Sequence, residues 1–157
     1  MSRVSFAERG GWWVVAQVLL LAIAAILPPW TARAGGGFGH PLQWLGIVLV
    51  VVGSLAVLAG FVGLGRSLTP FPRPRERAQL ATHGVYRFVR HPVYAGVLLA
   101  VFGWALAWLS VAGTAFFVLL AIFFDRKARR EERWLRERFP EYAAYARRVR
   151  RFIPGIY

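Results

Sequence analysis

Cysteine is absent from this chain, which excludes disulfide bonds, thiolate metal sites and cysteine nucleophiles. Acidic residues are scarce: seven Asp and Glu stand against 20 Lys and Arg, and the formal net charge is +13. Such a basic chain is typical of nucleic-acid-binding proteins and of membrane proteins with cationic cytoplasmic loops. Hydrophobic residues are abundant instead, at 57% of a chain of 157 residues. Because they fall in long runs, we predict a membrane protein, and the chain length predicts a single domain over residues 1–157.

Four hydrophobic stretches are predicted to be transmembrane helices, since a bilayer core requires about 20 apolar residues in a helix. They cover residues 12–30, 42–64, 92–109 and 111–124. The fourth stretch is short, but no Gly or Pro follows it until Pro140, so we expect its helix to continue through the basic residues beyond it. The predicted fold class is therefore all-α: an integral membrane protein with about four transmembrane helices and a cytoplasmic, helical C-terminal tail.

The basic residues are unevenly placed with respect to these stretches. All Lys and Arg residues except Arg33 lie before the first stretch, between the second and the third, or after the fourth. The positive-inside rule then places both termini and the middle loop in the cytoplasm, and we expect a multi-pass protein of a bacterial inner membrane. Because topology accounts for the charge, membrane lipid is expected as a partner and nucleic acid is not.

Glycine recurs every seven residues in the second stretch, at Gly46, Gly53 and Gly60. Residues seven apart lie near one face of a helix, and small residues on that face allow a neighbouring helix to approach closely. We therefore expect this face to be a packing surface.

A short polar run, GVYRFVRHPVYAG at residues 84–96, leads directly into the third hydrophobic stretch. Proline suits the first position of a helix, so Pro92 predicts a helix start immediately after His91. The free amides and the positive end of the helix dipole, with Arg90 beside them, would suit a carboxylate or a phosphate. The alternative is a positively charged helix boundary that binds no ligand.

A second polar cluster, formed by Lys127, Glu131 and Glu132, follows the fourth stretch. Lys127 and Glu131 are four residues apart on one helix face, so an ordinary solvated ion pair would explain them. Two adjacent acids in the most basic segment also suggest a site for a cationic ligand. Because a helical hairpin brings its ends together, we expect the side chains that follow to meet at one cytoplasmic membrane edge: His91, Tyr94, Lys127 and Glu131.

Taken together, these motifs resemble the isoprenylcysteine carboxyl methyltransferase family. The run at residues 84–96, a hydrophobic hairpin, the EERWL motif and the segment FPEYAAYARRVRRFIP follow one another in the chain. That family shares with the phospholipid methyltransferases an R-H-P-x-Y motif, a hydrophobic span and a Glu-Glu pair. The resemblance covers about residues 66–154, which would be the catalytic region. It implies an integral membrane enzyme that transfers a methyl group from S-adenosylmethionine to a lipophilic acceptor and releases S-adenosylhomocysteine.

The resemblance also implies roles for individual residues. Glu131 would hold the cofactor. The chemistry of the residues agrees with this role, since the charge of Glu131 suits the ammonium group and the helix start at His91, with Arg90, suits the carboxylate. Lys127 falls where the family usually has an arginine that engages the acceptor, and a lysine cannot form the bidentate fork of an arginine. The nearby arginines that could substitute are Arg126, Arg129 and Arg130. The cofactor contacts implied by position are Ala78, Gln79, Leu80, Ala81, Tyr86, His91, Pro92, Val93, Tyr94 and Glu131.

Two acceptor chemistries are open. A carboxylate, as in isoprenylcysteine-like O-methylation, is the preferred acceptor; it is ionised at neutral pH and needs no base. An amine, as in phospholipid N-methylation, would need a base, with Glu132 and His83 as candidates. In both cases a lipophilic or prenylated acceptor is expected to enter sideways from the bilayer, with Lys127 orienting its polar end. A non-enzymatic membrane protein that docks on anionic lipid through its basic tail is the alternative of another class. No metal site is expected, and the sequence does not define the oligomeric state.

Overall fold

The computed structural model describes residues 10–32, 39–65 and 80–157 of the chain. These residues form five α-helices and one short 3₁₀ helix, so the predicted all-α class is confirmed. The elements are α1 (Gly11–Thr31), α2 (Pro41–Leu64), η2 (Gly84–Arg87), α3 (Pro92–Ala107), α4 (Val111–Arg138) and α5 (Tyr142–Arg148). The predicted cofactor contacts Ala78 and Gln79 lie outside the described residues.

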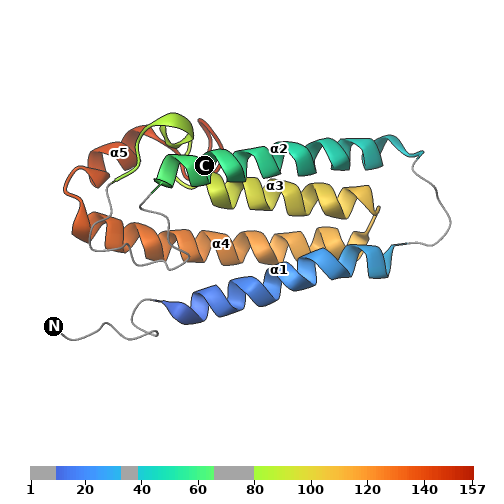
Figure 1. Cartoon of the computed structure of the whole chain (residues 1–157). Helices are drawn as coiled ribbons and strands as arrows, with labels where there is room; N and C mark the ends of the chain where they lie inside the picture. The colour runs from blue at the N-terminus through green and yellow to red at the C-terminus, as the bar shows by residue number, and fades with distance from the viewer. Residues whose placement is uncertain (1–9, 33–38, 66–79) are drawn as a thin grey trace.

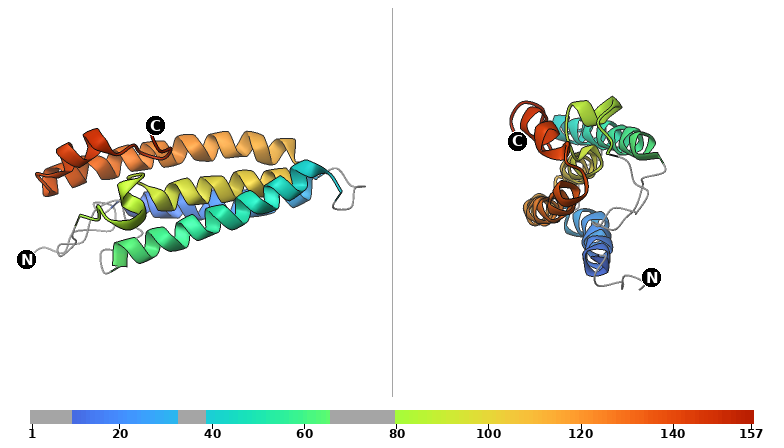
Figure 2. Two further views of the ribbon diagram at one scale, coloured as in Figure 1. Left: turned by 90° about the horizontal axis from the view of Figure 1, so that it is seen from above. Right: turned by 90° about the vertical axis from the view of Figure 1, so that its left-hand side faces the viewer.

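Helices α1 to α4 run alternately up and down and form an antiparallel bundle (Figures 1 and 2). Helix α3 packs most extensively against α2 and also contacts α4 and α1, while α1 lies against α4. At one end of the bundle α4 extends beyond the other helices, and η2, α5 and the last residues of the chain gather beside it (Figure 1, left). This end, called the site end below, also holds the start of α1 and the start of α3.

The helix boundaries follow from local sequence signals. Helix α4 begins after Ser110, whose hydroxyl oxygen accepts a hydrogen bond from the Gly113 amide at 2.8 Å and so caps the helix. The helix then continues without a break past Phe124 to Arg138, as predicted from the lack of Gly and Pro. Helix α3 begins with Pro92 at its first position, which confirms the predicted helix start.

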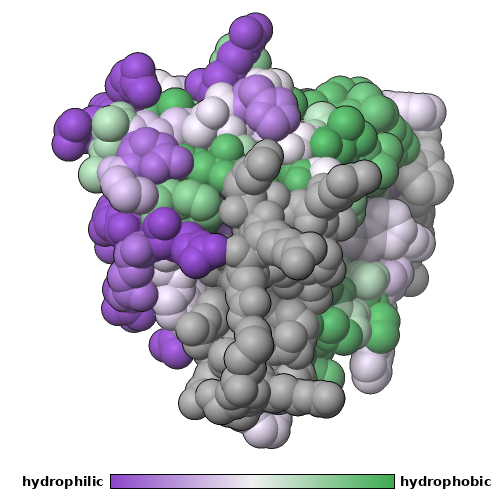
Figure 3. All heavy atoms as spheres, turned by 60° about the vertical axis from the view of Figure 1, so that its left-hand side comes forward, coloured by the Kyte–Doolittle hydropathy of each residue, from purple (hydrophilic) through white to green (hydrophobic). Residues whose placement is uncertain are grey.

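Two helices, α1 and α2, are long and apolar enough to cross a membrane by length and composition, and α3 is a shorter apolar helix. Only 17% of the most apolar window of α1 and of α2 is buried, and side chains such as Leu55 and Val62 are 59% and 82% exposed. Soluble proteins rarely expose large continuous apolar surfaces, so these helices indicate membrane association. Figure 3, which brings the site end forward, shows hydrophilic residues gathered on one side and hydrophobic surface beyond them.

The regularly spaced glycines of α2 allow α3 to approach closely, as the sequence predicted. A Cβ atom built on Gly46 would lie 2.5 Å from the carbonyl oxygen of Gly103, and one on Gly53 would lie 2.5 Å from that of Gly96. The reverse contacts are equally close, at 2.5 Å for Gly103 and 2.6 Å for Gly96. The backbones of α2 and α3 therefore touch, which fixes where α3 and its first residues stand.

The substitution Gly53→Ala is expected to destabilise the protein. Replacing glycine by alanine within a helix normally stabilises it by about 1 kcal/mol, but here the new methyl group would meet the α3 backbone, which cannot rotate away. Overpacking of this kind costs about 1–3 kcal/mol, so the Tm in detergent should fall by several degrees. The exposed neighbour Ser54 provides the control, because Ser54→Ala should leave the Tm unchanged. Equal Tm values for both variants would contradict the close approach.

Candidate functional site

His91 links the start of α3 to the two adjacent acids of α4. Its side chain makes no capping hydrogen bond to the helix. The imidazole is buried and turned toward α4 instead, with Nε2 3.3 Å from Oε1 of Glu132 and Nδ1 3.8 Å from Oε2 of Glu131. One ring therefore lies between the two carboxylates.

Tyr94 and Lys127 complete this group of side chains. The ring of Tyr94 stacks on that of His91, with centroids 5.3 Å apart and an angle of 3° between the planes. The Tyr94 hydroxyl donates a hydrogen bond of 2.9 Å to Oε2 of Glu131, and Nζ of Lys127 lies 5.4 Å from the centroid of the Tyr94 ring. The structure thus brings together the four side chains that were expected to meet. Their roles in binding stay predictions.

The two adjacent acids differ sharply in their surroundings. The side chain of Glu131 is 27% exposed, and its hydrogen-bond donor is Tyr94. Glu132 is 1% exposed and receives hydrogen bonds from Arg90 at 2.8 and 3.0 Å and from Arg151 at 3.0 and 3.2 Å. Glu131 is therefore the carboxylate that a ligand can reach, while Glu132 is enclosed by cations.

The charge state of Glu132 follows from these partners. Burial alone would raise the pKa of its carboxyl group, but hydrogen bonds from His91, Arg151 and Arg90 lower the pKa well below its usual range. A carboxylate held in this way stays ionised and is a weak base. The geometry therefore favours a positioning role for Glu132 over the general-base role that the sequence suggested.

The orientation of the Arg90 side chain differs from the one that the sequence suggested. The sequence suggested that it would face a ligand carboxylate at the start of α3. The guanidinium group instead pairs with Glu132 and donates to the main-chain carbonyls of Ala146, at 3.1 Å, and Val149. A largely buried cation requires such partners, and the residues that follow α4 supply them. Arg90 is therefore directed into the junction between α3, α4 and the end of the chain.

Lys127 is buried and contacts α1. It is 1% exposed, and its ammonium group donates a hydrogen bond to the side-chain carbonyl of Gln17. Burial lowers the pKa of Lys127 to about 8, although the charge of Glu131 opposes this shift. The sequence assigned no role to Gln17. A signal was present, since it is the one polar residue in an otherwise apolar stretch, and such residues in membrane helices are often functional.

The remaining predicted cofactor contacts lie around η2 and the start of α3. Tyr86 is buried, and its hydroxyl donates to the Gly60 carbonyl at 3.2 Å, so it joins η2 to α2. Leu80 and Ala81 are half-buried in the segment before η2. Pro92 is buried and Val93 half-buried at the α2–α3 contact. Of these residues, Tyr86 lies near enough to Glu131 and Tyr94 to interact with both electrostatically.

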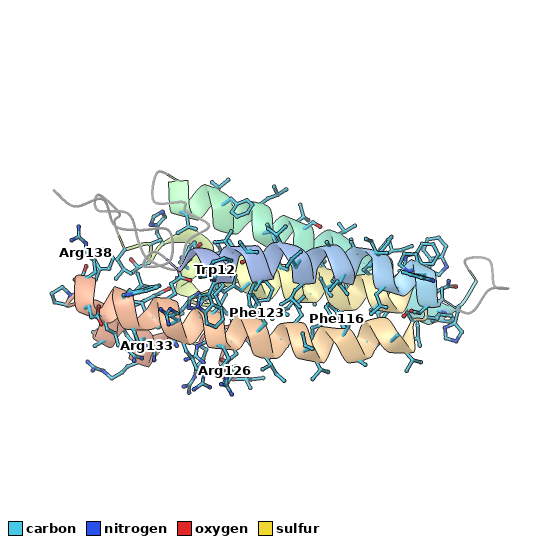
Figure 4. The ribbon with its side chains drawn as sticks, turned by 90° about the horizontal axis from the view of Figure 1, so that it is seen from below. Trp12, Phe116, Phe123, Arg126, Arg133 and Arg138 are labelled. Atoms are coloured by element: carbon cyan, nitrogen blue, oxygen red, sulfur yellow. The ribbon has the colours of Figure 1, made fainter. Side chains whose placement is uncertain are left out.

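The candidate acid–base residue and the candidate arginines lie elsewhere. His83 is exposed before η2. Arg129 pairs with Asp125 at 2.7 Å, Arg130 lies over the ring of Trp134, and Arg126 is exposed on the side of α4 away from α1 (Figure 4). Among these arginines the structure shows no contact with Glu131, Tyr94 or His91, so Lys127 is the cation that joins the group.

The described residues therefore define a class: a helical, membrane-associated protein with a histidine, tyrosine, lysine and acid group at one end of an antiparallel bundle. Comparison with known proteins gives the family. The phospholipid methyltransferase family model matches residues 41–142, and the chain belongs to this family. The resemblance drawn from the R-H-P-x-Y and Glu-Glu motifs is thereby confirmed.

Individual relatives are of two kinds. A probable protein-S-isoprenylcysteine O-methyltransferase of Oryza sativa subsp. indica is 35% identical over 119 residues, which cover 73% of this chain and 62% of that protein. The cobalt-zinc-cadmium resistance protein CzcN of Cupriavidus metallidurans is 36% identical over 124 residues, covering 76% of this chain and 56% of that protein. The nickel-cobalt-cadmium resistance protein NccN of Alcaligenes xylosoxydans xylosoxydans is 30% identical over 157 residues, covering 97% of this chain and 68% of that protein. The chain thus spans less than two thirds of the length of the rice relative.

Proposed function

We propose that this protein is a methyltransferase that uses S-adenosylmethionine and acts at a membrane on a lipophilic acceptor. The observation that carries the proposal is the Glu131 carboxylate, which is partly exposed and oriented by the Tyr94 hydroxyl beside the His91 ring. Membership of the phospholipid methyltransferase family supports the same reaction class.

The side chains of the site fit the chemical groups of this cofactor. When bound, S-adenosylmethionine supplies a methyl group on a positively charged sulfur. Glu131 would bind the ammonium group, since its carboxylate is the reachable one of the two acids. The stacked rings of His91 and Tyr94 would face the sulfonium or the adenine, because aromatic faces attract cations. Arg90 is turned toward Glu132, the His91 amide donates to the Arg151 carbonyl, and Pro92 has no amide N–H. The cofactor carboxylate would therefore be left to the amides of Val93 and Tyr94 in the first turn of α3.

We propose a carboxylate as the acceptor group, as in isoprenylcysteine-like O-methylation. Lys127 offers a positive charge next to the cofactor site, and at neutral pH a lysine with a pKa of about 8 is largely protonated. A carboxylate needs no base, and Glu132, the base suggested for an amine, is occupied by Arg90, Arg151 and His91. Catalysis would then consist mainly of holding the two reactants in line and excluding water.

One experiment separates the candidate functions. The purified protein is incubated with methyl-labelled S-adenosylmethionine and a membrane lipid extract, and the labelled product is identified. A product that loses its label in mild alkali indicates an ester, and an alkali-stable product indicates an amine, which is the alternative phospholipid N-methyltransferase function. Failure to bind S-adenosylhomocysteine or to transfer label would favour the non-enzymatic alternative, a protein that docks on anionic lipid through its basic tail.

The names of two relatives refer to metal resistance, but metal binding is not part of this proposal. Within residues 10–32, 39–65 and 80–157, no group of three or more His, Cys, Asp or Glu side chains could hold a metal ion. A role in metal resistance would rest on the similarity to CzcN and NccN alone.

The proposed topology has four membrane helices, with both termini and the site end on the cytoplasmic side of a bacterial inner membrane. The charge distribution supports it, since all Lys and Arg except Arg33 would lie on that side. Reporter fusions at Gly36 and after Tyr157 are expected to report opposite sides of the membrane. If both reporters are found on the same side, the four-helix topology is wrong.

A further inference from the structure

The segment 150–157 folds back against the start of α3, beside the proposed site. The main-chain amide of His91 donates a hydrogen bond of 3.0 Å to the carbonyl of Arg151, and the amide of Arg90 donates one of 2.8 Å to the carbonyl of Arg150. The ring of Phe152 lies 5.9 Å from the ring of His91. The segment therefore holds the backbone that carries His91 and also contacts its ring.

The side chain of Arg151 joins this segment to two acids of α4. Asp125 and Glu132 are seven residues apart, which places them two turns apart on one face of the helix. The Arg151 guanidinium spans them: Nη1 lies 2.8 Å from Oδ1 of Asp125, and Nε and Nη2 lie 3.0 and 3.2 Å from Oε1 and Oε2 of Glu132. With a side chain 14% exposed, Arg151 forms pairs that water screens little.

Tyr157 closes the other end of the same network. Its hydroxyl donates to Oδ1 of Asp125 at 2.8 Å and accepts from Arg151 and from Arg129, each at 3.0 Å. One donated and two accepted bonds use the full capacity of a hydroxyl group. The segment is therefore fastened to α4 at Arg151 and at Tyr157.

A continuous series of contacts leads from Arg151 to the proposed cofactor site. Arg151 and His91 share Oε1 of Glu132, at 3.0 and 3.3 Å. The ring of His91 stacks on Tyr94, whose hydroxyl donates to Glu131. Displacement of Arg151 would remove two hydrogen bonds from Glu132 and one from the backbone of His91.

We propose that Arg151 is a positioning residue that makes the cofactor site depend on the docking of segment 150–157. By joining Asp125 to Glu132, it holds the segment on α4 and keeps His91 and Tyr94 aligned with Glu131. The site is complete only while the segment is docked. This inference rests on the proposed function, in which Glu131 binds the cofactor.

The test uses Arg151→Gln in the full-length chain, purified in detergent. Amide hydrogen exchange is followed at His91, whose amide donates to the Arg151 carbonyl; exchange should speed up about tenfold or more, and affinity for S-adenosylhomocysteine should fall by roughly tenfold or more. Arg151→Lys should recover part of both effects, since an ammonium group keeps the charge and loses the fork. The matched control is Arg150→Gln, because Arg150 is the adjacent, exposed arginine, and it should change neither measurement.

A second variant covers the case in which Arg151→Gln does not fold. Tyr157→Phe removes only the hydroxyl of a residue that is 44% exposed, and it should shift both measurements in the same direction, by roughly threefold. Unchanged exchange at His91 in a folded variant overturns the docking role of the network. Faster exchange with unchanged S-adenosylhomocysteine affinity overturns the positioning role. If the unmodified protein binds no S-adenosylhomocysteine, the proposed function fails, and the exchange measurement still decides whether Arg151 holds the segment against His91.

Discussion

Replacing Glu131 with alanine is expected to weaken S-adenosylhomocysteine binding by about tenfold to a hundredfold. The reason is the loss of the one carboxylate of the adjacent pair that a ligand ammonium group can reach. A charge-assisted hydrogen bond of this kind contributes about 1.5–3 kcal/mol, which corresponds to that range of affinity. The affinity is best measured by calorimetry on the detergent-purified protein.

Two further variants make this measurement specific. Glu131→Gln keeps an oxygen that can accept the Tyr94 hydroxyl and removes only the charge, so it should weaken binding nearly as much as alanine does. Glu137→Ala removes an exposed acid from the same helix and should have no effect. Unchanged binding in a folded Glu131→Ala protein would count against the assignment of the cofactor site.

The substitution Lys127→Ala is expected to lower turnover by roughly tenfold to a hundredfold while leaving S-adenosylhomocysteine affinity nearly intact. Lys127 is placed to hold the anionic end of the acceptor, and loss of a group that orients a reactant can cost about a hundredfold in rate. Since Lys127 is buried, Lys127→Met should be measured beside it, because methionine keeps the apolar stem and removes only the charge. Loss of cofactor binding, with normal turnover at saturating cofactor, would instead place Lys127 in the cofactor site.

The same lysine predicts a dependence on pH. Burial lowers the pKa of Lys127 to about 8, so the side chain is charged below that pH and becomes neutral above it. Turnover of a carboxylate acceptor should therefore fall as the pH rises through about 8. Lys127→Arg should be tolerated and should keep its activity at pH values near 9, since arginine stays protonated and can hold a carboxylate with two hydrogen bonds. An identical decline in both proteins would show that another group titrates.

The helices and the meeting of the site residues could be predicted from the sequence because both depend on local signals and on connectivity. Long apolar runs, Pro92 at a helix start and the absence of Gly and Pro before Pro140 determine where α3 and α4 lie. The hairpin of α3 and α4 then leaves His91 and Glu131 at the same end. No knowledge of side-chain direction is needed for that step.

The partners of individual side chains could not be predicted, because they depend on how distant segments fold back. Arg90 precedes a helix start, which suggested an anion site, yet its guanidinium group is taken by Glu132 and by carbonyls near the end of the chain. Arg151 belongs to the basic C-terminal tail, and the sequence assigned it no individual role. Gln17 of α1 accepts a hydrogen bond from Lys127 of α4. In each case the contact joins residues far apart in the chain, and no local pattern encodes it.

The glycine contact between α2 and α3 makes this helix pair stiffer than the rest of the bundle. Where two backbones touch, as at Gly46 and Gly103, the helices cannot slide or separate without losing the whole contact. Helices α2 and α3 therefore move as one unit. Helix α1 lies against α4 and α3, and near its far end it is held by a hydrogen bond of 3.0 Å from Trp104 to the Ala25 carbonyl. Toward the site end, its contacts with α4 include the ring of Trp13 against that of Phe123 and the hydrogen bond from Lys127 to Gln17. Because these are side-chain contacts, we expect α1 to separate from α4 more easily than α2 separates from α3, and distances between labels on α1 and α4 would follow that motion. Gln17 would then move away from Lys127 with α1.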